Sequence, residues 1–119
     1  MESDAEPTTP RPGVPVRGST SGRPVMAALD LLGRRWALRI LWELHQSPAG
    51  FRELQRRCER MSSSVLSTRL GELTGARLLD LRDDAYRLTP LGEELVEALS
   101  PLNAWSARWA GETEGEAAR

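Results

Sequence analysis

Hydroxyl and guanidinium groups are concentrated in one stretch of the sequence, residues 51–73, which reads FRELQRRCERMSSSVLSTRLGEL. The stretch consists of two short amphipathic segments separated by a break, and three serines in a row follow the break. Side chains of this kind form hydrogen bonds with base edges and phosphate oxygens. The chemistry that the stretch predicts is therefore hydrogen bonding to a nucleic acid, without the making or breaking of covalent bonds.

The second segment, about residues 62–74, has the pattern of a helix that begins at its serines. A helix start leaves four backbone N–H groups unpaired, and one serine suffices to cap it. The remaining hydroxyls lie with Arg69 opposite the apolar stripe, where short side chains let a helix lie deep in the major groove of DNA. A solvated helix face is the alternative explanation. With two arginines of the preceding segment, the predicted DNA-binding residues are Arg52, Arg56, Ser62, Ser64, Ser67, Thr68 and Arg69.

The distribution of charge matters more than its total. The formal net charge of the 119 residues is −1, which argues neither for nor against a nucleic acid. Residues 34–77, however, contain nine arginines and four acids, whereas residues 78–119 contain four arginines and nine acids. A local excess of positive charge is typical of a phosphate-binding surface, although a solvated helical face explains the charge alone equally well.

Residues that could support catalysis or hold a metal are few and scattered. The single histidine, His45, closes a predicted helix, where the helix dipole explains it. The pair Glu93–Glu94 belongs to a helix start, and the glycines form no phosphate-binding loop. One cysteine, Cys58, provides neither a disulfide framework nor a metal cluster. We therefore expect neither an enzyme nor a cofactor.

The chain is expected to divide into a tail, a domain over residues 24–110 and a second tail. Residues 1–23 are rich in Pro, Gly, Ser and Thr, and they bury too little apolar surface to offset their ordering entropy, so we expect a disordered N-terminal tail. Residues 111–119 are expected to form a disordered C-terminal tail. In the first part of the domain, helical periodicity predicts helices over about residues 24–33, 35–46, 51–58 and 62–74.

The pattern changes in the second part of the domain. The segment RLLDLRDDAYRLT predicts a hairpin over residues 78–88 with a tight turn at Asp83 and Asp84. A last helix follows over about residues 90–110, with a kink or break at Pro101. Four helices, a hairpin and a helix in this order are typical of a winged helix-turn-helix domain, a mainly α fold with a small β-hairpin.

Large apolar side chains on the outer helices predict a second surface. On a helical wheel, Trp42 and Leu38 fall nearly opposite Ile40, so the second helix is apolar on two sides. The last helix has an apolar stripe whose first residues can cover the domain's own core and whose distal part can pair with a second copy. We therefore expect dimerisation through the N- and C-terminal helices, with a small aromatic effector between Trp42 and the terminal tryptophans as an alternative. The predicted interface residues are Val25, Met26, Leu29, Leu38, Trp42, Leu102, Trp105 and Trp109.

Three segments, ALDLLGRRWALRILWEL, GFRELQRRCERMSSSVLSTRLGEL and YRLTPLGEEL, together resemble the HxlR-type winged-helix transcriptional regulators of bacteria. The resemblance covers roughly residues 24–109. It implies a homodimer that binds a double-stranded DNA operator, with the recognition helix in the major groove and the wing, residues 78–88, near the minor groove. The residues that carry it are Leu29, Gly33, Trp36, Phe51, Glu53, Leu54, Ser62, Val65, Leu66, Arg69, Leu70, Leu88, Thr89, Leu91 and Gly92.

The sequence departs from the family pattern at two places. Many members have a cysteine just before the proline that opens the first helix, whereas this chain has Arg23 before Pro24, so thiol sensing through that position is not expected. Cys58 shares a stripe with Phe51 and Leu54 and is expected to be a buried structural residue. At the wing tip, two carboxylates stand where family members usually have basic residues, and phosphates repel carboxylates.

The function that these observations predict is a dimeric DNA-binding transcriptional regulator. The alternative is a winged-helix module that binds a ligand or another protein and holds DNA weakly or not at all, which the acidic wing and the acidic last third of the chain favour. The longest apolar runs fall short of the ~20 residues of a membrane span, and the N-terminus lacks the apolar core of a signal peptide. A cytoplasmic protein without a membrane partner is therefore expected.

Overall fold

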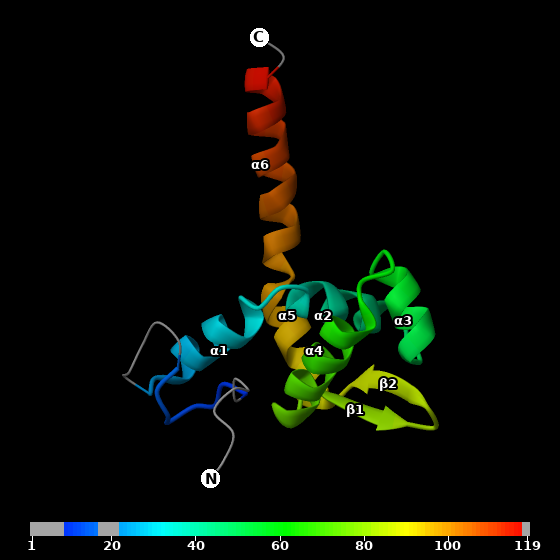
Figure 1. Ribbon diagram of the computed structural model, residues 1–119. Helices are drawn as coiled ribbons and strands as arrows, with labels where there is room; N and C mark the ends of the chain where they lie inside the picture. The colour runs from blue at the N-terminus through cyan, green and yellow to red at the C-terminus, as the bar shows by residue number, and fades with distance from the viewer. Residues whose placement is uncertain (1–8, 17–21, 118–119) are drawn as a thin grey trace.

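Helices and one hairpin form the part of the chain that the computed structural model describes, which is residues 9–16 and 22–117 (Figure 1). Most of the predicted N-terminal tail, residues 1–8 and 17–21, lies outside the described residues. The helices are α1 (Pro24–Leu32), α2 (Ala37–Gln46), α3 (Phe51–Arg57), α4 (Ser63–Gly75), α5 (Pro90–Leu99) and α6 (Pro101–Ala117), and the strands are β1 (Leu79–Arg82) and β2 (Ala85–Leu88).

Local signals set the ends of α1 and α5. Pro24 occupies the first turn of α1, where its missing N–H group costs nothing, and the N–H of Gly33 closes the helix on the carbonyl of Leu29 at 2.9 Å. At the start of α5, the side chain of Thr89 accepts a hydrogen bond of 3.0 Å from the N–H of Gly92. Both starts agree with the sequence prediction.

The start of α2 differs from the prediction by two residues. Trp36 has φ 77°, a left-handed conformation that a right-handed helix cannot include, so α2 begins at Ala37 rather than at Arg35. The Trp36 ring is half-buried against the core, and the guanidinium of Arg35 lies 5.9 Å from its centroid. The start of α2 therefore has no side-chain cap, and the residue before it packs against the core.

The predicted last helix is two helices. α5 ends at Leu99 and α6 begins at Pro101, which agrees with the predicted break. The predicted end near residue 110 is wrong, because α6 continues to Ala117. Backbone hydrogen bonds extend a helix without large apolar side chains, and no proline follows Pro101 to interrupt it. Figure 1 shows α6 extending away from the rest of the domain.

The hairpin joins the helices through more than its own strands. Antiparallel pairing places Leu79 opposite Leu88. Outside the hairpin, Ala49 forms an isolated bridge with Tyr86, with hydrogen bonds of 3.1 and 2.8 Å between their backbones. The connection between α2 and α3 therefore acts as a short third strand, which fixes the hairpin beside the helix-turn-helix segment.

The core lies where the inner face of α2 meets α3, α4, α5 and the hairpin. Its members recur at helical spacing along α2 and α4, as the sequence predicts. They include Ile40, Leu41, Leu44, Leu54, Leu66, Leu70, Leu73, Leu79 and Val96. Among the described residues, no helix has the length and apolar character that a membrane crossing requires.

Candidate nucleic-acid interface

The turn between α3 and α4 has a backbone that side chains hold in place. Glu59 and Arg60 both have φ 59°, which non-glycine residues seldom adopt. The side-chain amide of Gln55 donates to the carbonyl of Met61 at 2.8 Å and to the hydroxyl of Ser63 at 3.1 Å. Gln55 therefore ties α3 to the first residue of α4, a role that the sequence analysis did not identify because the amide acts across the turn.

The exposed face of α4 consists of small residues. Ser62 caps the helix by accepting a hydrogen bond of 3.2 Å from the N–H of Val65, as expected. The buried side of the helix is anchored by leucines and by Glu72. On the other side, every exposed residue of α4 is a serine, a threonine or a glycine. These residues are Ser63, Ser64, Ser67, Thr68, Gly71, Thr74 and Gly75.

Arg69 does not extend freely from this face. Its Nε donates to the carbonyl of Arg35 at 2.7 Å, and its Nη1 lies 3.2 Å from Oε1 of Glu72. Only 19% of its side chain is exposed. Two of the three guanidinium nitrogens of Arg69 thus bind groups within the chain, whereas the sequence analysis expected this side chain to reach a base or a phosphate.

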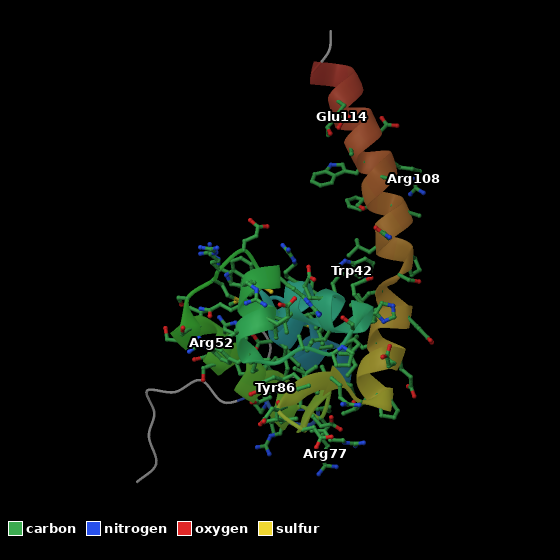
Figure 2. The ribbon with its side chains drawn as sticks, turned by 90° about the vertical axis from the view of Figure 1, so that its right-hand side faces the viewer. Trp42, Arg52, Arg77, Tyr86, Arg108 and Glu114 are labelled. Atoms are coloured by element: carbon green, nitrogen blue, oxygen red, sulfur yellow. The ribbon has the colours of Figure 1, made fainter. Side chains whose placement is uncertain are left out.

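The arginines of α3 have different environments. Arg52 is exposed, and Figure 2 shows it on the side of the domain away from α6. Arg56 is also exposed and pairs with Glu53. Arg57 instead donates to the carbonyl of Ser47 at 2.8 Å and thereby holds α3 against the end of α2. Arg52 and Arg56 therefore border the exposed face as cations that a phosphate could reach.

The wing is a two-residue hairpin with an acidic tip. Asp83 and Asp84 have φ 54° and 63°, the left-handed pair that a type I′ turn requires. Both residues are exposed. The only cation on β1 is Arg82, which pairs with Asp80 at 3.6 Å. The hairpin that the sequence predicts is therefore present, with Asp83 and Asp84 at its turn.

Groups that could do redox, nucleophilic or metal chemistry are buried or dispersed. Cys58 is fully buried, and burial raises the pKa of its thiol, which disfavours the reactive thiolate. Nδ1 of His45 lies 3.1 Å from a carboxylate oxygen of Glu93 on α5. Within the described residues, no three His, Cys, Asp or Glu side chains form a group that could hold a metal ion.

An apolar surface lies on the other side of the domain from Arg52. Trp42, on the outer side of α2, lies beside α6 in Figure 2 and borders an apolar groove of about 320 Å³ between α2 and the α5–α6 junction. Trp105 and Trp109 are exposed on α6, and their rings stack at 5.4 Å. The other exposed or half-buried members of the predicted interface are Val25, Met26, Leu29, Leu38 and Leu102.

A capped helix with a small polar outer face, a helix-turn-helix connection and a following hairpin define a winged helix-turn-helix protein. Comparison with known proteins agrees with this class. A family model described as HxlR-like helix-turn-helix matches residues 31–114. The chain therefore belongs to the HxlR family, which is a family of DNA-binding transcriptional regulators and not of enzymes.

Individual relatives give the same result. The chain is 30% identical over 89 residues to YvaP of Bacillus subtilis (strain 168), an uncharacterized HTH-type transcriptional regulator, with 69% of this chain and 82% of YvaP covered. It is similar to the crystal structure of quinone-bound YodB from B. subtilis, at 28% identity and a TM-score of 0.65, over 71% of this chain and 94% of YodB. A possible HxlR family transcriptional factor from Thermoplasma volcanium GSS1 is 25% identical, with a TM-score of 0.63, over 70% and 81% of the two chains.

Proposed function

We propose that the protein is a dimeric transcriptional regulator that inserts α4 into the major groove of an operator. The observation that carries this proposal is the exposed face of α4, which consists of seven small residues. The opposite side of the helix is buried in the domain through three leucines and Glu72. A helix without long outer side chains can approach base edges closely, and its hydroxyls can donate or accept there. In this arrangement Ser62, Ser64, Ser67 and Thr68 face the bases or the adjacent backbone.

Phosphate contacts come mainly from α3. Arg52 and Arg56 are exposed beside the α3–α4 turn, and cations at that position bind the backbone on either side of a groove. The acidic wing tip adds little affinity, because its two carboxylates are repelled by phosphates. The family membership favours DNA binding over a winged-helix module without DNA.

A shift assay with DNA flanking the protein's own gene, at low and moderate salt, tests the proposal. Ser67→Glu adds a carboxylate to the exposed face of α4 and is expected to weaken binding at least tenfold. Gln46→Glu adds the same charge at the exposed end of α2 and is the control, expected to bind as the wild type does. Equal affinities for the two variants, with circular dichroism unchanged, would show that α4 does not face DNA.

The proposed dimer uses the apolar surface of α1, α2 and α6. Val25 and Leu29 of α1 are 57% and 58% exposed, and Trp109 of α6 is 57% exposed. Large apolar groups in such number are characteristic of interaction surfaces, and a symmetric pair of chains would bury them. A dimer would also present two copies of α4 to half-sites about one DNA turn, ~10 base pairs, apart.

A small aromatic effector is a separate proposal. YodB of B. subtilis has been crystallised with a quinone bound. In this chain the groove beside Trp42 has a volume of about 320 Å³. Its lining is mostly apolar and also includes Arg39, Ser100, Asn103 and Ser106. A pocket of this size accommodates a small aromatic molecule. Titration with a benzoquinone should quench the fluorescence of the wild type more than that of Trp42→Phe. Equal quenching would exclude the groove as the site.

A further inference from the structure

A buried chain of charges connects α1 with the middle of α4. Nη2 of Arg34 lies 3.4 Å from Oδ2 of Asp30 at the end of α1, and its Nη1 lies 2.7 Å from Oε2 of Glu72 on α4. The other oxygen of Glu72 binds Nη1 of Arg69, whose Nε donates to the carbonyl of Arg35. The side chains of Asp30, Arg34 and Glu72 are each less than 10% exposed.

Such a chain fixes geometry more effectively than it adds stability. Removing charges from water costs free energy that their attraction barely recovers, so a buried ion pair is weak evidence for stability. Its geometry is nevertheless strict, because both carboxylate oxygens of Glu72 and the planar guanidinium groups must stay aligned. The turn between α1 and α2 is thereby joined to α4 at Arg69 and Glu72, one helical turn apart.

We infer that Arg34, Glu72 and Arg69 are positioning residues, which hold the exposed face of α4 at one orientation relative to α1. The inference rests on the proposed function, since it explains how the reading face is presented to DNA. Because α1 belongs to the proposed dimer interface, the same contacts set the orientation of α4 relative to the second copy. Arg69 then acts on sequence selectivity through Glu72 and the Arg35 carbonyl, without contacting DNA itself.

Exposure separates this role from a direct contact. The side chain of Arg56, proposed to contact phosphate, is 64% exposed, against 19% for Arg69. A phosphate contact by Arg69 would require at least one of its intramolecular bonds to break. The two roles also differ in salt dependence, because each phosphate contact contributes about −0.9 to the slope of log K against log salt, whereas positioning contributes nothing.

The experiment compares Arg69→Met, Arg56→Met and Arg39→Met by fluorescence-anisotropy titration at four salt concentrations. Each protein is titrated with DNA flanking its own gene and with a scrambled duplex of the same length. Arg39→Met is the control for the loss of a guanidinium. Arg39 binds Glu43 at 2.8 Å, Glu59 at 3.2 Å and the carbonyl of Arg57 at 2.6 Å, and none of these groups belongs to the buried chain of charges. Circular dichroism verifies that each variant is folded, and Arg69→Lys, which keeps the charge next to Glu72, tests rescue.

Positioning predicts that Arg69→Met loses at least tenfold in the ratio of specific to scrambled affinity while its salt slope stays that of the wild type. Arg69→Lys should recover part of the ratio, and Arg56→Met should lower the slope by about one with the ratio preserved. A slope lowered by about one in Arg69→Met would mean that Arg69 contacts phosphate, and this would overturn the inference. An unchanged ratio would overturn it equally.

Amide hydrogen exchange keeps the inference testable without DNA. Arg69→Met should accelerate exchange in the α1–α2 turn and in the middle of α4 at least fivefold, whereas Arg39→Met should not. If the wild type binds neither duplex, the proposed function fails and exchange alone decides whether Arg69 and Glu72 hold α4. Unchanged exchange in Arg69→Met would reject the positioning role in that case.

Discussion

Glu53 occupies a central place among the cations of α3. Its carboxylate accepts hydrogen bonds from Arg56 and Arg57, and these bonds hold the pKa of Glu53 below its ordinary value. A carboxyl whose pKa is lower in the folded than in the unfolded chain stabilises the fold above its unfolded pKa. That contribution is lost as the pH falls through the lowered folded-state pKa.

We predict that Arg56→Met raises the pKa of Glu53, because this change removes the hydrogen bond from Arg56, which lowers that pKa most. The measurement is an NMR pH titration of the Glu53 side-chain carboxyl carbon. Arg108→Met, which removes a guanidinium on α6, is the control. The same midpoint in wild type and Arg56→Met would show that the Arg56 side chain does not hold the carboxylate in solution.

The junction between the hairpin and α5 depends on one glycine. Gly92 is buried, and a Cβ atom at this position would lie 2.2 Å from the carbonyl oxygen of Leu78 and 3.3 Å from a methyl group of Leu88. A backbone carbonyl cannot yield as the end of a flexible side chain can. The first turn of α5 therefore packs against Leu78 and Leu88 only because no side chain separates them.

We expect Gly92→Ala to lower the free energy of unfolding by about 1–3 kcal/mol or more, the cost of overpacking a closed site. Gly71→Ala is the matched control, since Gly71 lies within α4 and has nothing within 4 Å of its Cβ position. That change should raise the free energy of unfolding by about 0.5–1 kcal/mol. Urea denaturation measures both, and equal effects would contradict the packing argument.

The turn of the wing has two aspartates, Asp83 and Asp84, in the left-handed backbone conformation. Asparagine and glycine adopt the left-handed conformation more readily than other residues, and they form the preferred type I′ pair. Relief of about 1–2 kcal/mol of left-handed strain exceeds the entropy cost of a glycine, about 0.5–1 kcal/mol. Asp83→Asn combined with Asp84→Gly should therefore stabilise the hairpin by about 0.5–1 kcal/mol. It should also tighten DNA binding on all sequences, since two carboxylates leave the wing tip.

Anisotropy titrations with specific and scrambled duplexes measure the second effect of the wing variant. Glu112→Gln with Glu114→Gln removes two carboxylates from α6 and is the control for net charge. If both double variants tighten binding equally, the gain comes from net charge and the wing does not approach DNA.

The proposed DNA-binding surface and the apolar surface lie on opposite sides of the molecule. Both figures show α6 extending from the domain, and Figure 2 shows Trp42 beside it and Arg52 on the far side. Because α6 extends from the domain and its stacked tryptophans are exposed, contacts with its own chain bury little of its apolar surface. A second copy that covers it would explain the length of α6 and would leave both copies of α4 free to face DNA.

We predict a homodimer whose dissociation becomes easier by several kcal/mol, about 2–4, when Trp105 and Trp109 are both replaced by alanine. Sedimentation equilibrium on wild type and double variant gives the difference directly. Leu81→Ala, at an exposed apolar residue of the hairpin, is the control and should dimerise normally. A wild-type monomer at micromolar concentration would contradict the predicted dimer. A double variant that dimerises as well as the wild type would show that the interface lies elsewhere.

The sequence by itself determined most of the helices and strands of this protein and the composition of the exposed face of α4. The starts of α1, α4 and α5 depend on a proline in the first turn or on a side-chain cap by Ser62 or Thr89, so local patterns predict them. The apolar periodicity of α4 likewise leaves its small residues outward whatever the surroundings. The exposed tryptophans of α6 follow from spacing for the same reason.

Only the tertiary structure decided what Arg69 and Trp36 do. Arg69 lies on the polar side of a helical wheel, but its surroundings include Arg35, 34 positions earlier in the chain. The bridge between Ala49 and Tyr86 is equally distant in sequence. A hydrogen bond between residues far apart leaves no periodic pattern, because it depends on how the elements pack and not on the conformation of either segment. Contacts of this kind determine that the side chain of Arg56 is 64% exposed whereas that of Arg69 is 19% exposed and bonded within the chain.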